Sequence, residues 1–117
     1  MENGFTVKSH FEGKEPSVAK IYGEVLKQAR RFGKVEEDPK KTSIHLNNTT
    51  AFAGVATRKN AIILTIKSDQ AIENPRIFKS EQTSARRFHH QVKLTSPADV
   101  DAELIGWLKE AYAMSGK

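Results

Sequence analysis

The chain has 117 residues, of which 38% are hydrophobic and 28% charged, and it contains no cysteine. This length and composition predict a single domain over residues 1–117, with flexible ends at 1–10 and 115–117. The lack of cysteine excludes a disulfide framework, a thiolate zinc site and a cysteine nucleophile. No apolar run reaches the ~18 residues of a membrane span, and the first residues lack the layout of a signal peptide. These features predict a cytoplasmic protein with no membrane partner.

The net charge of +5 is concentrated in the middle of the chain. Residues 39–93 contain ten Lys or Arg but only three Asp or Glu, whereas residues 1–38 contain seven of each kind. Residues 94–117 are acidic, with two basic and four acidic residues. A basic segment attracts phosphates or acidic partners, but many small proteins carry such charge only for solubility. Both interpretations stay open at this point.

Two amphipathic helices are predicted near the ends of the chain. The first runs from about Glu15 to Phe32, because Pro16 suits a first turn, apolar residues recur at three- and four-residue steps, and Gly33 follows. The second runs from Ser96 to about Met114. Its expected buried stripe consists of Val100, Leu104, Trp107, Leu108, Ala111 and Tyr112.

The acidic cluster of Asp99, Asp101 and Glu103 lies at the start of this second helix. Carboxylates there are stabilised by the positive end of the helix dipole, so the cluster indicates a helix start and not an active site. Gly23 and Gly106 lie inside the two helices, where glycine is unfavourable. We expect both to be explained by close packing against a sheet.

Between the helices the apolar period changes from 3.6 to 2, which predicts strands. They are expected at 42–47, 51–57, 61–67, 77–82 and 86–94, with a loop at 69–75. Val35 can begin a further edge strand, and the carboxylates at 36–38 are predicted to be solvated turn residues. The short connections predict an α+β fold: an antiparallel meander sheet of about five strands with an N-terminal and a C-terminal helix packed on one face.

No catalytic signature or phosphate-binding glycine loop occurs in the sequence, so no catalytic residue, metal ligand or cofactor is assigned. Among the histidines, His89 and His90 are adjacent on a strand and point to opposite faces. His45 and His89 could share an ion only if their strands were neighbours, with Glu81 in reach. Ordinary surface histidines are the preferred interpretation.

The basic residues give the best candidate site. If both helices cover one face of the sheet, the other face carries polar and basic side chains from alternate strand positions. Positive charge with hydrogen-bonding groups can hold a phosphate backbone. No aromatic residue is expected on this face for base stacking, since Phe52 and Phe78 are both predicted to lie in the core. The candidate nucleic-acid or polyanion site is Lys41, His45, Arg58, Lys59, Arg87, His89 and Lys93.

Several segments together resemble an uncharacterised bacterial domain family, domain of unknown function 5655. They are FEGK at 11–14, PKKT at 39–42, FAGV at 52–55, RK at 58–59, SPADVD at 96–101 and ELIGWLKEAY at 103–112. Similar domains occur alone and at the C-termini of larger proteins described as predicted transport or nuclease-related. The resemblance therefore implies an accessory binding or interaction module, and it supplies no catalytic residues.

The sequence thus predicts an uncharacterised, non-catalytic module that contacts nucleic acid, another polyanion or a partner protein through a basic sheet face. One alternative is a small-ligand or enzymatic pocket between sheet and helices that uses His90 with Tyr22 or Tyr112. Another is a homodimer, as opposed to a monomer, in which the strand at 51–57 pairs edge to edge with its copy.

Overall fold

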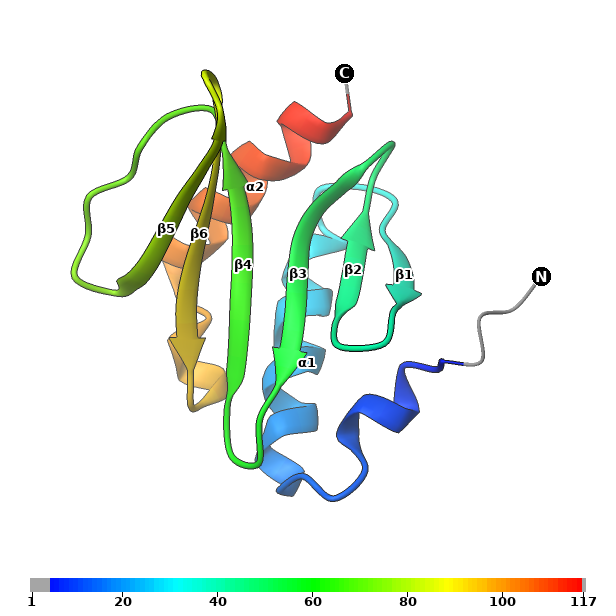
Figure 1. The fold of residues 1–117 in the computed structure, drawn as a ribbon. Helices are drawn as coiled ribbons and strands as arrows, with labels where there is room; N and C mark the ends of the chain where they lie inside the picture. The colour runs from blue at the N-terminus through cyan, green and yellow to red at the C-terminus, as the bar shows by residue number, and fades with distance from the viewer. Residues whose placement is uncertain (1–4, 117) are drawn as a thin grey trace.

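The structure is a computed structural model that describes residues 5–116. Two α-helices and six strands make up the fold, together with two short 3₁₀ helices. Along the chain they are η1 (Lys8–Phe11), α1 (Pro16–Ala29), β1 (Glu36–Pro39), β2 (Ile44–Asn47), β3 (Ala51–Thr57), β4 (Ile62–Ser68), β5 (Ile77–Ser84), β6 (Arg87–Leu94), η2 (Pro97–Asp99) and α2 (Ala102–Ser115) (Figure 1).

The six strands form one antiparallel sheet in the order β1-β2-β3-β4-β6-β5. The predicted α+β fold, an antiparallel sheet with an N-terminal and a C-terminal helix, is confirmed. The order departs from a simple meander at one point, because the segment after β4 passes β6 and β5 becomes the outermost strand. The sheet also has one strand more than expected, since residues 36–39 pair with β2 as β1.

The extra strand corrects the prediction that the carboxylates at 36–38 are solvated turn residues. An edge strand needs only one partner, so alternate side chains can stay in water while the backbone pairs. Glu37 points to the helix side, where it accepts a hydrogen bond of 2.6 Å from the Tyr22 hydroxyl and lies 3.4 Å from Arg30. Asp38 points to the other side, opposite His45.

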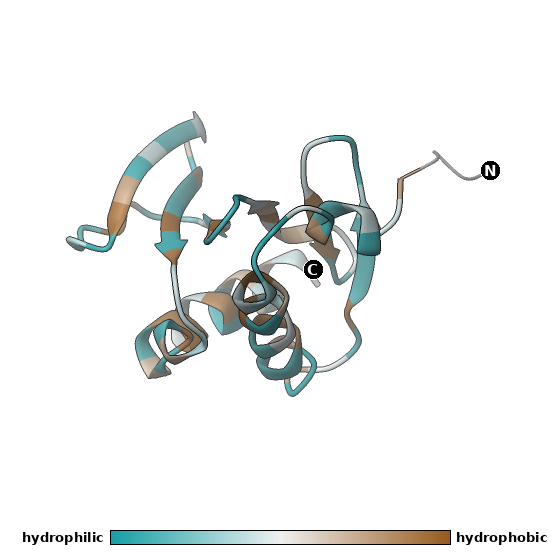
Figure 2. Cartoon of the chain, turned by 90° about the horizontal axis from the view of Figure 1, so that it is seen from below, coloured by the Kyte–Doolittle hydropathy of each residue, from teal (hydrophilic) through white to brown (hydrophobic). Residues whose placement is uncertain are grey.

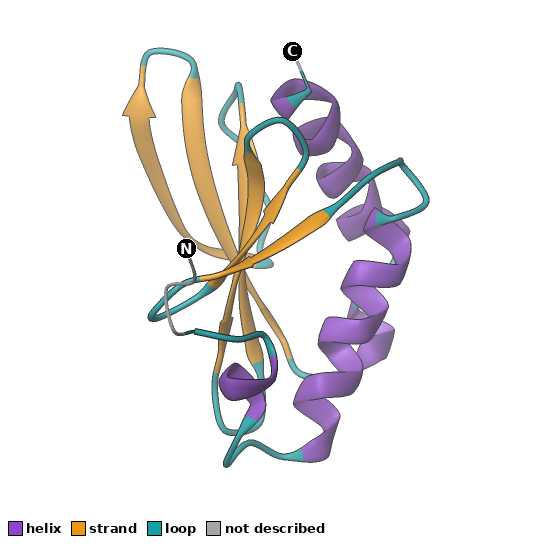
Figure 3. Ribbon diagram, turned by 90° about the vertical axis from the view of Figure 1, so that its right-hand side faces the viewer, coloured by secondary structure: helices purple, strands orange, loops and turns teal. Residues whose placement is uncertain are grey.

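Both α-helices lie on one side of the sheet, and the opposite side is left open (Figure 3). The end-on view shows the same two layers, with the β5–β6 hairpin rising away from the helices (Figure 2). The core lies between the layers and consists of alternate strand residues and the apolar stripes of α1 and α2. Its largest fully buried side chains include Phe52, Ile21, Ile44, Leu64 and Leu108. The alternation expected for β6 is confirmed, since His90, Val92 and Leu94 are buried.

The C-terminal helix begins later than predicted. Ser96 caps the short η2, in which the Asp99 carboxylate accepts from the Ser96 N–H at 3.2 Å. The chain then leaves the helical conformation at Val100, and Asp101 caps α2 by accepting from the Leu104 N–H at 3.1 Å. Two capping residues in series therefore divide the expected single helix, because each cap satisfies its own set of free N–H groups.

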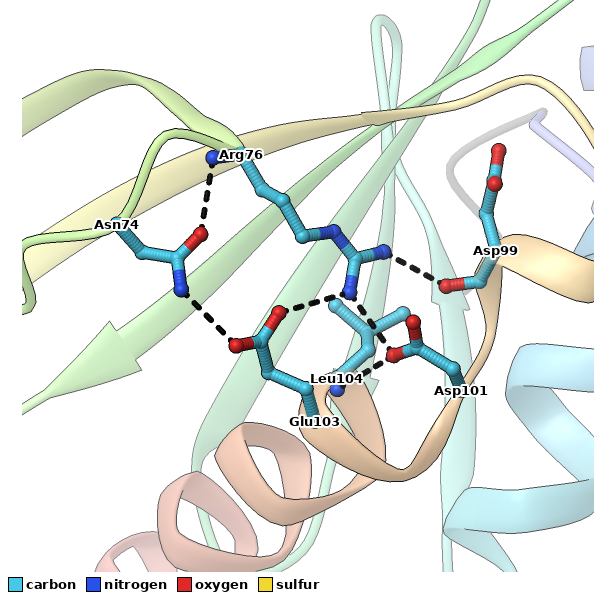
Figure 4. Close-up of polar contacts among 6 residues, drawn as sticks. All are labelled: Asn74, Arg76, Asp99, Asp101, Glu103 and Leu104. Atoms are coloured by element: carbon cyan, nitrogen blue, oxygen red, sulfur yellow. Dashed lines mark hydrogen bonds and ion pairs between the residues drawn. The ribbon is translucent and has the colours of Figure 1, made fainter.

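An ion-pair cluster joins the segment after β4 to the start of α2 (Figure 4). The Arg76 guanidinium donates to Asp101 at 2.8 Å, to Glu103 at 3.2 Å and to the Asp99 carbonyl at 2.7 Å. It also lies over the Trp107 ring, 6.0 Å from its centroid. Trp107 and Tyr112, both predicted to lie in the buried stripe, are only partly buried and pack against the rim of the core. The acidic cluster is a helix start, as predicted, and it also neutralises Arg76.

The strand β3 lies inside the sheet, between β2 and β4. This corrects the prediction that the strand at 51–57 pairs edge to edge with a second copy, because both of its backbone edges are already used. A bulge opposite Leu46 and Asn47 places two successive β3 residues, Phe52 and Ala53, in the core.

The helical glycines are not explained by packing, contrary to expectation. Gly23 and Gly106 are exposed, and a Cβ at either position would meet nothing within 4 Å. Gly33 is different, because its φ is +149° and a Cβ would come within 2.5 Å of the Tyr112 hydroxyl. The glycine that another side chain approaches closely is therefore Gly33, in the turn after α1.

The N-terminal segment forms hydrogen bonds from residue 6 onward. The hydroxyl of Thr57 donates to the His10 carbonyl at 2.6 Å, and the His10 ring lies 2.8 Å from the Lys40 carbonyl. The predicted flexible positions 1–4 and 117 lie outside the described residues. Among the residues that are described, no helix is long and apolar enough to cross a membrane.

Candidate functional site

The candidate site is the sheet face that the helices leave uncovered, which we call the open face. Strand pairing assigns residues to it, because cross-strand partners point to the same side. One row across the sheet runs through Asp38, His45, Gly54, Thr65 and Gln91. The open face comprises this row together with Ser43, Ala56, Ile63, Lys67, His89 and Lys93. Arg87 lies at the start of β6, and its guanidinium donates to the Met114 sulfur of α2 at 3.4 Å, so this side chain reaches toward the helix side.

A shallow hollow of about 250 Å³ lies on the open face. Its floor is formed by small residues of β3, including Gly54 and Ala56. Taller side chains line it on both sides, with His45 from β2 and with Lys67 and His89 from β4 and β6. Small residues on the central strand between longer ones on its neighbours therefore produce a groove along the strand direction.

Six of the seven predicted site residues lie on the open face or in the turns that border it, and the Arg87 side chain instead contacts Met114 of α2. The seven residues form two groups. Lys41, Arg58, Lys59 and Lys93 lie at the end of the sheet formed by the β1–β2 and β3–β4 turns, since Ile44 pairs with Val55 and Ile63 with Lys93. His89, opposite Lys67, and Arg87, opposite Ser84, lie toward the other end of β6. His45 lies between the groups. Arg87 and Lys93 are six residues apart on one strand, which corresponds to about 20 Å.

These seven residues are free of ion pairs within the described part of the chain. The salt bridges found there involve Arg30, Lys34, Lys40 and Arg76. Three carboxylates point to the same side of the sheet as the open face: Glu36 and Asp38 of β1 and Glu81 of β5. Glu36 is paired with Lys34 at 3.5 Å. Asp38 is paired with Lys40 at 3.0 Å, and this hydrogen bond lowers the pKa of Asp38. Glu81 lies opposite His89 on the neighbouring strand.

Lys67 joins the second group, although the sequence did not select it as a site residue. It is the direct cross-strand partner of His89. Burial lowers the pKa of His89 below its ordinary value of 6.5, and the positive charge of Lys67 lowers it further, while Glu81 acts in the opposite direction. The sequence signal for Lys67 was the alternation along β4, but only the pairing of β4 with β6 brings Lys67 to His89.

His45 and His89 are not placed to share a metal ion. Both line the hollow, but they come from β2 and β6, with β3 and β4 between them. Three strand spacings separate them by about 14 Å, far more than two ligands of one ion allow. Among residues 5–116, no three His, Cys, Asp or Glu side chains are grouped as a metal site would require.

Phe52 and Phe78, the two aromatic residues considered for base stacking, differ in their exposure. Phe52 is buried, as predicted, and packs edge-on against Tyr112 with ring centroids 5.3 Å apart. Phe78 is 57% exposed on β5, which corrects its predicted place in the core. The reason is that β5 is the outermost strand of the sheet, and after Ile77 all of its residues are exposed.

The alternative pocket of His90 with Tyr22 or Tyr112 is not assembled. His90 is 1% exposed, and its ring nitrogens lie 2.8 Å from the Ser80 hydroxyl and 3.3 Å from the Gln70 carbonyl. Tyr22 instead bonds to Glu37, and burial together with that hydrogen bond raises the pKa of its phenol. Tyr112 donates to the Lys34 carbonyl at 2.8 Å. Each of the three side chains thus forms its hydrogen bonds with different partners.

A larger cleft does exist between α2 and the segment after β4. One hollow of about 530 Å³ is lined by residues 67–72 and by Trp107, Glu110 and Met114. It adjoins a second hollow of about 730 Å³ beside Arg86 and Arg87, and the two share Asp69, Gln70 and Met114. The sequence did not predict this cleft, because it arises only where the loop 69–76 crosses to the outer strand.

Comparison with known proteins gives one match. A family model described as "Domain of unknown function (DUF5655)" matches residues 7–115. Neither the curated proteins nor the solved structures contain a match to the chain.

Proposed function

The chain belongs to the DUF5655 family of domains of unknown function, and we propose that this domain is a non-catalytic module that binds a polyanion, nucleic acid above all, through the open face. One observation carries the proposal: basic side chains lie along a sheet face that no helix covers, and none of the seven candidates is neutralised by an ion pair in the described chain. The absence of cysteine fits a cytoplasmic setting.

Phosphate contact follows from the arrangement of the two groups of basic residues. Lys41, Arg58 and Lys59 are exposed in turns, where long side chains can follow an irregular backbone. Arg87 and His89 offer a second contact about 20 Å away along β6. A flexible single strand of nucleic acid could cross the groove between these two groups of basic residues. Such contacts position a phosphate backbone and do not by themselves read a base sequence.

Bound phosphate would also act on His89. Burial and Lys67 disfavour its protonation in the free protein. A phosphate beside it favours the charged form, so binding takes up a proton and becomes tighter as the pH falls toward 6. This dependence distinguishes contact at the groove from attraction by net charge alone.

The test is fluorescence anisotropy with single- and double-stranded DNA and RNA across a salt series. We expect the logarithm of the affinity to fall linearly with the logarithm of the salt concentration, by ~0.7–0.9 for each phosphate contact. The variant Lys41→Glu/Arg58→Glu/Arg87→Glu should weaken binding and flatten this slope by about 2 to 3.

A matched control reverses three exposed lysines on the helix side, Lys20→Glu/Lys27→Glu/Lys109→Glu. It changes the net charge by the same amount, so it should weaken binding far less than the open-face variant. Equal weakening by both variants would show attraction by net charge and refute the assignment to the open face. No binding at low salt would refute the polyanion proposal altogether, and pull-down of an acidic protein would then identify the other predicted kind of partner.

A second candidate function is small-ligand binding in the cleft beside α2. It is favoured by the size of the hollow and by its mixture of Lys67, Asp69 and Glu110 with apolar residues of α2. Trp107 lines this cleft and is the one tryptophan of the chain, so its fluorescence reports on ligand entry directly. A metabolite that changes Trp107 emission without competing with nucleic acid would establish this second site.

A further inference from the structure

The two edges of the sheet differ sharply in how they are protected. β1 is four residues long, ends in Pro39 and carries three carboxylates in ion pairs, Glu36, Glu37 and Asp38. Short length, proline and charge all discourage the addition of another strand. β5 is eight residues long, and every residue from Phe78 to Ser84 is exposed. It presents the longer and less protected backbone edge.

The exposure of β5 includes both of its faces. It pairs only with β6, and the β5–β6 hairpin rises away from the helices (Figure 2). Its regular part runs from Lys79 to Gln82, between irregularities at Ile77/Lys79 and Gln82/Ser84. This segment offers unpaired backbone groups of the kind that β-strand addition uses.

The side chains of this regular segment are complementary to themselves. In an antiparallel pair of two β5 strands related by a two-fold axis at Ser80, Lys79 of each copy lies opposite Glu81 of the other. A two-fold axis at Lys79 or at Glu81 would place like charges opposite each other. Both side chains are exposed, and neither forms an ion pair within the described chain.

We infer that β5 is a homodimerisation edge, in which two copies of this chain pair antiparallel about Ser80 and join their sheets into one. The strand that adds to β5 is the β5 of a second copy, because this arrangement forms two Lys79–Glu81 pairs, one on each side of the two-fold axis. Since Lys79 and Glu81 point to the same side as Gln91 and His89, the two open faces become continuous across the joined sheet. The interface borders the open face but contains none of the seven candidate residues, so each proposal can be tested without the other.

The test is analytical ultracentrifugation over a concentration series reaching about 1 mM, because an interface of one strand pair is small and weak. The wild-type chain should form a concentration-dependent dimer. Lys79→Glu places two pairs of carboxylates opposite each other, and Glu81→Lys does the same with two pairs of lysines. Each single variant should weaken the dimer by about tenfold or more.

The double variant Lys79→Glu/Glu81→Lys exchanges the charges and restores both opposite pairs, so its dimer should return to near wild-type strength. The control Lys109→Glu/Glu110→Lys makes the same exchange on exposed positions of α2 and should leave association unchanged. Amide hydrogen exchange at 79–82 should slow with protein concentration. A monomer at every concentration overturns the inference, as does a dimer that is insensitive to both single variants.

Discussion

The close approach of Gly33 to Tyr112 offers the sharpest test of how the turn after α1 packs against α2. Gly33 has a φ of +149°, a conformation that L side chains rarely adopt, and a Cβ there would lie 2.5 Å from the Tyr112 hydroxyl. That hydroxyl donates to the Lys34 carbonyl at 2.8 Å, and the Tyr112 ring packs on Phe32 with centroids 5.7 Å apart. Gly33→Ala must therefore both strain the backbone at residue 33 and displace the Tyr112 hydroxyl.

The expected cost can be estimated from these two contributions. Backbone strain of this kind costs ~1–3 kcal/mol, and loss of the Tyr112 hydrogen bond costs ~0.5–1.5 kcal/mol. We expect Gly33→Ala to lower the free energy of unfolding by about 2–4 kcal/mol. Urea denaturation measures this as a lower midpoint with an unchanged slope, provided that the folded state is otherwise intact.

A double-mutant cycle separates the two contributions. Tyr112→Phe removes the hydroxyl, and the next ring atom is 3.4 Å from the added Cβ. Gly33→Ala should therefore cost less in the Tyr112→Phe background, with a coupling of ~0.5–1.5 kcal/mol. As a control, Gly23→Ala in the exposed middle of α1 should stabilise the protein by ~0.5–1 kcal/mol. A neutral Gly33→Ala, or the same cost in both backgrounds, would refute the close approach.

Two further predictions concern charged groups. Arg76→Leu should destabilise the protein by ~1–2 kcal/mol at pH 7, a modest value because Asp101 and Glu103 are about half exposed. The hydrogen bond from the Leu104 N–H, and then Arg76, lower the pKa of Asp101 below 3.8, so this stabilisation is present above that pH and is lost as the pH falls through the folded value. Urea unfolding at pH 7 and pH 3 should show the gap between wild type and variant closing, and an unchanged gap would contradict the assigned ion pairs. By NMR titration, His89 should have a pKa below 6.5 that rises in Lys67→Met; no rise would mean that Lys67 does not act on His89.

Local patterns in the sequence predicted where most helices and strands lie and which face of the sheet each strand residue points to. The steps of three and four residues in α1 and the alternation in β6 arise from the geometry of a single helix or strand, so neighbouring residues alone reveal them. For this reason the open-face positions of His45, His89 and Lys93, and the buried position of His90, followed from the order of residues. The capping roles of Ser96 and Asp101 are local in the same way, although their separation into two helices was not foreseen.

Only the tertiary structure decided which strands are neighbours and which charges are neutralised. The crossing of the loop 69–76 puts β5 at the edge and β3 inside, because strand order depends on pairing between distant segments and not on local period. The same crossing brings Arg76 to Asp101 and Glu103, which removes one basic residue from the surface charge. Residues 36–39 became a strand because β2 supplied a partner for their backbone. The sequence by itself therefore determined the elements and the candidate face, while long-range pairing determined its edges, its groove and its free charges.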